Sequence, residues 1–479
     1  MTSKSNKTLL NKPSLLEETN DSENTIQLKR LLTLYIEYLG KFVDNFIPEL
    51  EIRFGTKNIK SLTKIDFYNV VKTILNADFK LNTESYSLKI ITENENSNIR
   101  CQINGISNIQ NYCINNNLSD IDISEYDFIE KQYFNIKQQK ILPIDFDDFN
   151  FRAAFQVEQK FKHNDTIIQN ILQKWESTKK IFRYIKRFEY KHPDFPILIH
   201  LSIVKMSNNK SNKYESYFNI HDSNVFNNFE NYEIEIELDN NIINLNSNYQ
   251  QDDILYNKIK TSIKYILIGL QRSNFPISIT EEKLILNNYF KIIDKQINLN
   301  ETAISSTNFI GPSSSTLQII NLLKKNNDLY NNIPNIRENY TVTDKADGER
   351  KLMIISDDGK IYFITTSMNV EFTGTRTFNK DFYNSIIDGE HILNNKKGEY
   401  INTYACFDIY FIKEKNVTGL PFIQKTDDTK ETDSTRLNIL NHLIKKLDIK
   451  SFNSKSDVIF NIIIKKFYAN NIFKIIRQM

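Results

Sequence analysis

Cysteine, glycine and proline are all scarce in this sequence, with 3, 11 and 9 copies among 479 residues. The cysteines Cys101, Cys113 and Cys406 lie far apart and form no CxxC pair. This spacing argues against a zinc ribbon and against an even set of disulfides. The cysteine usage therefore favours a reducing compartment.

Net charge and long apolar runs are also nearly absent. The formal charge is +2, so the chain has no global field for wrapping nucleic acid, although a local basic channel remains possible. The longest apolar run, 265–270, is far shorter than the roughly 20 residues of a membrane helix. The N-terminal residues contain no signal-peptide stretch. We therefore expect an intracellular protein that does not associate with membranes.

A chain of 479 residues exceeds what one hydrophobic core normally organises, so two or three domains are expected. Helical spacing predicts helices over 25–42, 61–75, 165–178 and 252–270, the second capped by Ser61 or Thr63. We expect a disordered tail at 1–24, a first domain at 25–245, a helical connector at 246–300 and a second domain at 301–479.

Strict alternation of polar and apolar residues predicts strands at 49–55, 151–161, 182–190 and 232–239. The polar faces carry acids in blocks, such as Glu49 with Glu51, and Glu233 with Glu235 and Glu237. A sheet with one wet face would alternate in the same way. Three glutamates on one strand face repel each other, however, unless positive charge lies among them.

If the two acidic strands are neighbours in a closed sheet, their carboxylates would form a site for Mg²⁺ or Mn²⁺, which prefer oxygen ligands. Basic residues on the same faces would bind phosphate oxygens: Arg53, Arg100, Lys131, Arg152, Arg183 and Arg187. Such a site suits hydrolysis of a terminal phosphate, with Glu235 orienting the attacking water.

These paired Glu-x-Glu strands resemble the metal-dependent triphosphate tunnel family, closed antiparallel barrels that include RNA triphosphatases of fungi, protozoa, poxviruses and giant viruses. The resemblance implies that Glu49, Glu51 and Glu237 are metal ligands and that Glu235 is catalytic. It also implies that Glu158 and Glu233 are supporting carboxylates and that the basic residues named above bind phosphate. One position departs from the pattern, because His200 stands where an Asp is expected.

A second motif, KADGER at 345–350, suggests covalent nucleotide transfer. A lysine that attacks an α-phosphate must first lose its proton, which a bound cation and basic neighbours promote. Gly348 permits a tight turn, and Arg350 could bind ribose or phosphate. Downstream strands at 386–392 and 404–412 add Asp388, Glu390 and Phe407.

Together these segments resemble the covalent nucleotidyltransferase superfamily, which holds GTP-dependent mRNA capping enzymes and ATP-dependent polynucleotide ligases. The resemblance implies that Lys345 forms the lysyl-nucleotide adduct and that Phe407 lies near the base. It places Asp347, Gly348, Arg350, Asp388 and Glu390 in the GTP-binding set.

A tunnel-type domain followed by KADGER looks like the capping enzymes of poxviruses and giant viruses, and FIGPSSST at 309–316 is similar to their connector. The implied fold is α+β: a triphosphate-tunnel barrel with packed helices, then a partial, ligase-type nucleotidyltransferase domain. The implied function is removal of the γ-phosphate of 5′-triphosphate RNA, then GMP transfer from GTP through lysyl-GMP to form the 5′ to 5′ cap. The implied location is the host cytoplasm, a viral factory or a virion.

The sequence contains no later Glu-Gly and Lys-x-Lys strands, no closing OB domain and no glycine-rich methyltransferase signature. The run at 462–479 looks like a strand and helix that precede those elements. We therefore expect an incomplete guanylyltransferase domain and, as a further partner, a methyltransferase or the remaining capping-enzyme segment. Two alternatives stay open: a ligase-like adenylyltransferase fused to a polyphosphatase, and a nucleotide-binding subunit without catalysis.

Overall fold

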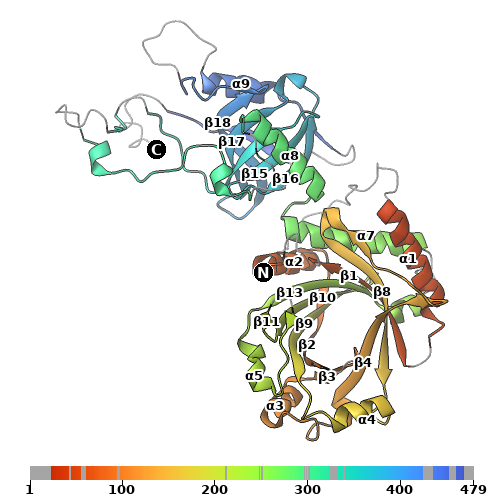
Figure 1. The fold of residues 1–479 in the computed structure, drawn as a ribbon. Coiled ribbons are helices and arrows are strands. Elements are labelled where there is room, and N and C mark those ends of the chain that lie inside the picture. The colour runs from red at the N-terminus through yellow and green to blue at the C-terminus, as the bar shows by residue number, and fades with distance from the viewer. Residues whose placement is uncertain are drawn as a thin grey trace, which may run out of the picture. The chain divides into compact units, whose positions relative to one another are not determined.

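The structure is a computed structural model that divides into two compact units between Arg272 and Ser273 (Figure 1). It describes residues 23–468, apart from 43–44, 56–60, 94–97, 211–212, 247–248, 250–251, 296, 298, 300–302, 324–332, 338–339, 424–434 and 453–459. The expected tail lies outside the described residues except for Glu23 and Asn24, which begin a helix. The helix expected near the end of the 462–479 run also lies outside them.

The first unit is built around a nine-stranded antiparallel sheet in the order β1-β13-β10-β9-β2-β3-β4-β8-β7. Its strands are β1 (Phe46–Phe54), β2 (Lys80–Thr92), β3 (Arg100–Asn104), β4 (Tyr126–Tyr133), β7 (Ile144–Phe146), β8 (Phe151–Phe161), β9 (Lys180–His192), β10 (Phe195–Met206) and β13 (Asn231–Leu238). Strand β1 also pairs with β8 along its whole length, from Phe46 opposite Gln159 to Phe54 opposite Phe151. This pairing closes the sheet into a barrel, with β7 outside the ring, and confirms the predicted fold class (Figure 1).

Helices and two small hairpins surround the barrel. The helices are α1 (Glu23–Leu39), α2 (Lys64–Asn76), α3 (Ile106–Asn115), α4 (Thr166–Gln173), α5 (Ile220–Ser223), α6 (Asn240–Leu245) and α7 (Asp252–Gln271). The hairpins pair β5 (Asn135–Ile136) with β6 (Gln139–Lys140), and β11 (Asn209–Lys210) with β12 (Lys213–Tyr214). Thr63, one of the two expected caps, caps α2, and Asp66 completes a capping box with it.

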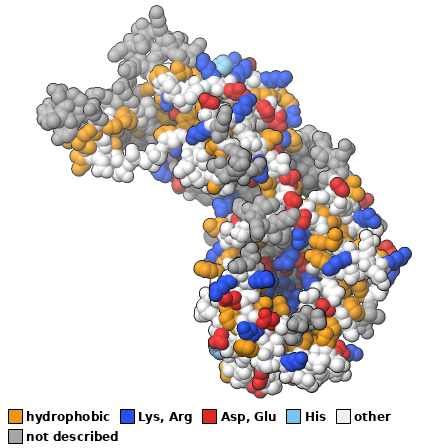
Figure 2. Space-filling model, in the orientation of Figure 1, with side chains coloured by type: hydrophobic (Ala, Val, Ile, Leu, Met, Phe, Trp, Pro, Cys, Tyr) orange, Lys and Arg blue, Asp and Glu red, His pale blue; other side chains and the backbone are white. Residues whose placement is uncertain are grey.

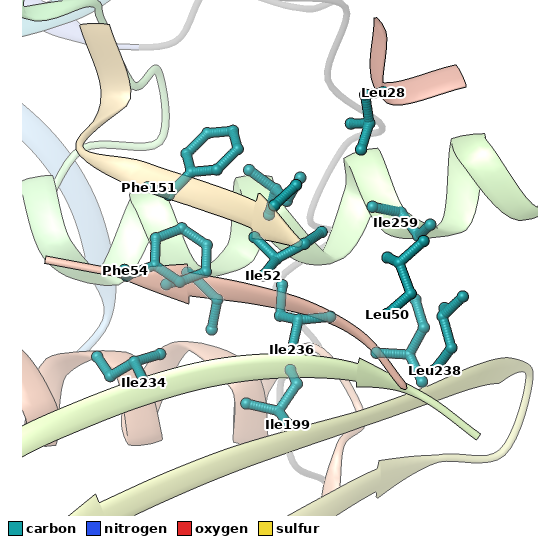
Figure 3. Packing of buried hydrophobic residues seen from close by; sticks show 14 of the residues in the cluster. Leu28, Leu50, Ile52, Phe54, Phe151, Ile199, Ile234, Ile236, Leu238 and Ile259 are labelled. Atoms are coloured by element: carbon teal, nitrogen blue, oxygen red, sulfur yellow. The ribbon is translucent and has the colours of Figure 1, made fainter. Parts of the chain in front are cut away.

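The outer face of the barrel forms its main hydrophobic core. Because strand side chains alternate, Leu50, Ile52 and Phe54 of β1 point away from the barrel interior and pack under α1 and α7 (Figure 3). Helix α7 crosses α2 so closely that a Cβ on Gly269 would lie 2.7 Å from the Cα of Val70. Because these apolar residues face outward, the alternating residues of the same strand, Glu49, Glu51 and Arg53, face the barrel interior.

The expected connector at 246–300 contains two helices, and these belong to different units. Helix α7 contributes Leu255, Ile259 and Ile266 to the core of the barrel. Helix α8 (Ile279–Ile292) contributes Ile285 and Tyr289 to a core of the second unit. Each apolar stripe is buried against a different sheet, so 246–300 is divided at Arg272 and Ser273 and is not a separate connector.

The second unit contains an eight-stranded sheet. Seven of its strands follow the order β19-β18-β17-β14-β15-β16-β20, and the eighth, β21, pairs in parallel with β18. Its strands are β14 (Glu349–Ile355), β15 (Lys360–Thr365), β16 (Val370–Thr377), β17 (Ser385–Asn394), β18 (Tyr400–Ile412), β19 (Lys415–Asn416), β20 (Ile449–Ser451) and β21 (Asn461–Ile464). Helix α8 packs against the strand side chains of one hydrophobic cluster, and α9 (Arg436–Lys446) packs against the strand side chains of a second cluster. Within the described ranges of both units, no helix has the length and apolar character to cross a membrane.

Candidate active sites

The barrel interior places the two acidic strands side by side. In the antiparallel register of β1 and β13, Glu51 lies opposite Glu237, and Arg53 lies opposite Glu235. Sequence alternation predicted that these side chains share a face, but not that the two strands are neighbours. Figure 2 shows acidic and basic side chains gathered within a hollow of the barrel unit.

Carboxylates converge in this interior closely enough to hold a cation. Ligand oxygens of Glu49, Glu51 and Glu237 all lie within 4.8 Å of one another. Burial and the negative charge of Glu237 raise the pKa of Glu49 to about 7, even though Lys131 opposes the shift. Burial and Glu235 likewise raise the pKa of Glu51. The three oxygen donors fit a hard divalent cation, which would relieve this repulsion.

Basic side chains alternate with these acids. The ammonium nitrogen of Lys131 lies 2.7 Å from Glu49 Oε2 and 2.6 Å from Glu51 Oε2. Arg53 Nε lies 3.1 Å from Glu51 Oε1 and 2.9 Å from Glu235 Oε1. The guanidinium of Arg187 reaches the other oxygen of Glu235 at 3.2 Å. Each strongly buried carboxylate is therefore paired.

Glu235 is held in its ionised form by these contacts. Burial alone would raise its pKa, but Arg187 and Arg53 outweigh burial and lower it. A carboxylate that stays ionised can accept a hydrogen bond from a water molecule and orient it. This environment is compatible with the role expected from the sequence.

The remaining arginines that we expected to bind phosphate have two kinds of surroundings. Arg183 donates to Glu233 at 2.6 Å, and Arg100 donates to Glu158 at 2.5 Å, both inside the barrel. Arg152 lies opposite Arg53 in register, but its guanidinium binds Asp145 of β7 at 2.7 Å. Arg152 is thus anchored to β7, and Asp145 is not a carboxylate of the cation cluster.

The barrel also contains a basic residue that the sequence reasoning missed. Lys89 lies opposite Arg183 in the β2–β9 register. Its pKa is lowered to about 7, first by burial and then by Arg100, Arg187 and Arg183. The alternation of Leu88, Lys89 and Ile90 was a sufficient signal, because it gives Lys89 the same inward parity as its neighbours across the sheet.

His200, which departs from the expected Asp, also faces inward. It lies opposite Glu235 on β13 and opposite Glu189 on β9. Although burial opposes it, the charge of Glu237 and hydrogen bonding to Glu189 raise the pKa of His200 to about 9. Burial would raise the pKa of Glu237, but His200, Arg187 and Lys131 together outweigh burial and lower it to about 2.

In the second unit, the KADGER segment leads into β14 beside β17. Lys345 is exposed, and so is Asp347. The backbone N–H of Gly348 donates to Glu390 Oε1 at 3.1 Å. A Cβ at Gly348 would lie 2.6 Å from the carbonyl oxygen of His391. Glycine therefore allows this segment to approach β17.

Arg350 is fixed by several neighbours. Its Nε and NH2 atoms donate to Asp388 at 3.1 and 2.6 Å, and its NH1 donates to the carbonyl of Pro312 at 2.8 Å. The guanidinium lies 5.7 Å from the ring centroid of Phe407. The ammonium nitrogen of Lys465 lies 5.9 Å from the centroid of the same ring. Burial lowers the pKa of Lys465, and Lys345 contributes in the same direction, so the two lysines are close enough to interact.

Comparison with known proteins gives a family match within the second unit. Residues 330–478 match the catalytic domain of the mRNA capping enzyme. A probable mRNA-capping enzyme of Acanthamoeba polyphaga mimivirus is 28% identical over 229 residues, which are 47% of this chain and 16% of the relative. The chain thus spans about a sixth of that curated relative.

Two solved structures are similar at low identity. The mimivirus capping enzyme triphosphatase is 15% identical and has a TM-score of 0.30, with coverage of 50% of this chain and 97% of that chain. An RNA triphosphatase of S. pombe is 12% identical and has a TM-score of 0.31, with coverage of 53% of this chain and 95% of that chain.

Proposed function

We propose that this chain acts in mRNA 5′ capping, with a barrel that hydrolyses the γ-phosphate of 5′-triphosphate RNA and a second unit that accepts GMP from GTP on Lys345. The observation that carries the first activity is the convergence of Glu49, Glu51 and Glu237 inside a closed barrel. The match of residues 330–478 to the capping-enzyme catalytic domain supports the second activity.

In the barrel, Glu49, Glu51 and Glu237 would hold Mg²⁺ or Mn²⁺, which when bound polarises the terminal phosphate and neutralises its charge. Arg100, Arg183 and Arg187 offer guanidinium groups to the phosphate oxygens. Ionised Glu235 would orient the attacking water and receive its proton. The carboxylates Glu158 and Glu233 keep Arg100 and Arg183 in place through their ion pairs.

In the second unit, the neutral amine of Lys345 would attack the α-phosphate of GTP, forming a P–N bond to GMP as the bond between the α- and β-phosphates breaks and pyrophosphate leaves. Asp388 and Pro312 hold Arg350 where it could contact the ribose, and Phe407 lies beside it for the base. Glu390 is fixed near the motif by Gly348.

The first activity is tested with RNA labelled on its γ-phosphate. Glu51→Gln should lower phosphate release about 100-fold, as when one preorganised charged group is removed from an active site. Glu84→Gln is the matched control, because Glu84 is exposed on β2 and pairs with Lys186. Equal phosphate release by wild type and Glu51→Gln would refute a hydrolytic barrel and favour a binding subunit.

The second activity is tested by incubating the chain with labelled GTP or ATP and measuring acid-stable label on the protein. Label from GTP that disappears in Lys345→Ala but persists in Lys397→Ala supports capping. Lys397 is a suitable control because it lies in the exposed turn between β17 and β18. Capture of label from ATP alone would instead support the ligase-like alternative.

A further inference from the structure

Three basic side chains lie in a row across three neighbouring strands of the second unit. In the antiparallel registers, Arg376 of β16 lies opposite Lys360 of β15 and opposite Lys450 of β20. Directly opposite residues of antiparallel strands share one face of the sheet, and like charges in these positions destabilise it. The row is therefore costly unless negative charge lies beside it.

Carboxylates of the chain neutralise the two lysines at the ends of the row. Lys360 Nζ lies 3.2 Å from Glu281 Oε1 and 3.7 Å from Asp358 Oδ2. Lys450 Nζ lies 3.3 Å from Asp448 Oδ2. The charge that remains without a counter-charge is therefore at the centre of the row.

Arg376, at this centre, has aromatic neighbours in place of a carboxylate. Within the described ranges of the second unit, no carboxylate forms an ion pair with Arg376, and its buried Nε has no hydrogen-bond partner. The guanidinium carbon lies 4.2 Å from the ring centroid of Phe378 and 5.9 Å from that of Phe452. A guanidinium over an aromatic ring still has its in-plane N–H groups, which match the oxygens of a phosphate.

The two phenylalanines beside the row are exposed. Phe378 is 54% exposed, and Phe452 is 37% exposed. Lys450 Nζ lies 5.7 Å from the ring centroid of Phe378, and Lys360 Nζ lies 5.4 Å from that of Phe452. Exposed rings interleaved with cations are typical of surfaces that bind single-stranded nucleic acid, because bases stack on the rings while the cations bind the backbone.

A row of cations on a sheet could instead serve only to prevent edge-to-edge pairing of sheets. That role belongs to the edge strand, which is β20 in the described sheet, whereas Lys360 and Arg376 lie on the inner strands β15 and β16. Exposed Phe378 and Phe452 would also work against it, because apolar side chains at an edge promote association. The combination of cations and rings favours a binding surface.

We propose that the second unit binds single-stranded RNA through a surface formed by five side chains: Lys360, Arg376, Phe378, Lys450 and Phe452. This inference rests on the proposed function for the identity of its ligand, the transcript whose 5′ end is modified. Arg350 lies near the start of β14, whereas Lys360 follows the turn after its other end, Ile355. The surface is therefore separate from the nucleotide site, and it would hold the body of the transcript.

The first test measures binding of the full chain to a fluorescent single-stranded RNA of about ten nucleotides, within the usual size of such sites. The RNA carries a 5′-hydroxyl, so it offers no triphosphate to the barrel. Phe378→Ala should weaken binding about tenfold, the loss expected for one base–aromatic stack. Phe229→Ala is the matched control, because Phe229 is 95% exposed in the barrel unit, and it should bind as wild type.

Further variants separate the contributions of charge and of stacking. Arg376→Gln should weaken binding and reduce the slope of log affinity against log salt by about 0.7, because one phosphate contact is lost. Arg30→Gln, at an exposed position of α1, is the control. Phe378→Trp should keep wild-type affinity, and RNA should quench its fluorescence above the constant signal of buried Trp175.

Far-ultraviolet circular dichroism identifies any variant that fails to fold. Failure of wild type to bind this RNA, or unchanged affinity in folded Phe378→Ala or folded Arg376→Gln, would overturn the surface. Displacement of the RNA by poly-glutamate at matched charge would also overturn it and would indicate an acidic protein partner. Label capture from GTP on Lys345 needs no RNA and should be equal in Phe378→Ala and wild type. Failure of wild type to capture label while it still binds RNA would therefore contradict the proposed function and not this surface.

Discussion

The ammonium nitrogen of Lys131 lies 2.6 Å from Glu51 Oε2, deep in the barrel, where the Glu51 side chain is only 4% exposed. The same nitrogen also contacts Glu49. The single strand β1 therefore directs two acids at one lysine of β4, and the lysine offsets the repulsion that a bound cation would also offset. This arrangement makes the stability of the barrel sensitive both to Lys131 and to the cation.

Lys131→Met should destabilise the cation-free barrel by about 3 kcal/mol, because two buried carboxylates lose their partner. Trp175 is the only tryptophan of the chain and is buried in the barrel unit, so its fluorescence during urea unfolding reports on that unit. Added Mn²⁺ should restore part of the loss. Lys186→Met, at an exposed pair with Glu84, should cost less than about 1 kcal/mol. Equal effects of the two substitutions would contradict the buried-pair account.

Anion binding in the barrel should weaken as pH rises through 7, because the pKa of Lys89 lies at about 7 in the folded protein, below the usual lysine value of 10.5. Above pH 7 the free site must take up a proton to bind an anion, so affinity should fall by up to about tenfold between pH 7 and 8. Sulfate is a suitable probe because its charge is constant in this range, and its affinity is measurable from the shift in urea midpoint. A pH-independent affinity in wild type would refute the assignment.

The same depressed pKa has a stability consequence with a definite sign. Between about pH 7 and 10.5 the folded state binds fewer protons at Lys89 than the unfolded state, so this group makes the barrel more stable as pH rises. Lys89→Met should remove that contribution and should also flatten the pH dependence of sulfate binding. The check is the difference between wild type and Lys89→Met in Trp175-detected unfolding across this range.

Gly269→Ala should destabilise the barrel unit even though alanine is the better helix former. Alanine gains about 1 kcal/mol in helix propensity, but its Cβ would lie 2.7 Å from the Cα of Val70, a backbone atom that cannot move aside alone. Overpacking of this kind costs about 1–3 kcal/mol. Gly40→Ala, where no atom lies within 4 Å of the added Cβ, is the control in the same unfolding measurement.

Gly311→Ala should displace Arg350 in the second unit. Gly311 has φ +120°, and a Cβ there would lie 2.6 Å from Arg350 NH2. The change should increase hydrogen exchange of 309–312 and lower nucleotide capture on Lys345 by about tenfold or more, since a misplaced contact group reduces catalysis sharply. Gly419→Ala meets no atom within 4 Å and should leave both measurements unchanged. Unaltered hydrogen exchange and nucleotide capture in Gly311→Ala would show that residues 309–312 do not position Arg350.

Sequence patterning predicted the barrel strands because alternation reports directly on which side chains share a face. It could not reveal neighbours: Glu51 and Glu237 come together through pairing of strands from opposite ends of the domain. The same rule placed Arg152 on the inner face, but could not show that Asp145 of β7 would bind it at the edge of the barrel.

Helix prediction also succeeded because periodicity is a local signal, and it also failed to identify which elements pack together. The apolar stripe of α7 was visible in the sequence, but a stripe does not state which sheet will bury it. Only the packed cores show that Ile259 joins the barrel and that Tyr289 joins the second unit. The surroundings of His200 were equally hidden, because Glu189 and Glu235 lie on neighbouring strands.

Closure of the barrel by β1 has a consequence for biosynthesis. Strand β1 pairs with β8 on one side and with β13 on the other, although β13 ends at Leu238. A ribosome must therefore release the chain past residue 238 before Glu49 and Glu51 can meet Glu237. Until then β1 has an unpaired edge, and contacts that distant in sequence form slowly. Cation capture would thus mark the moment at which the nascent barrel is finished.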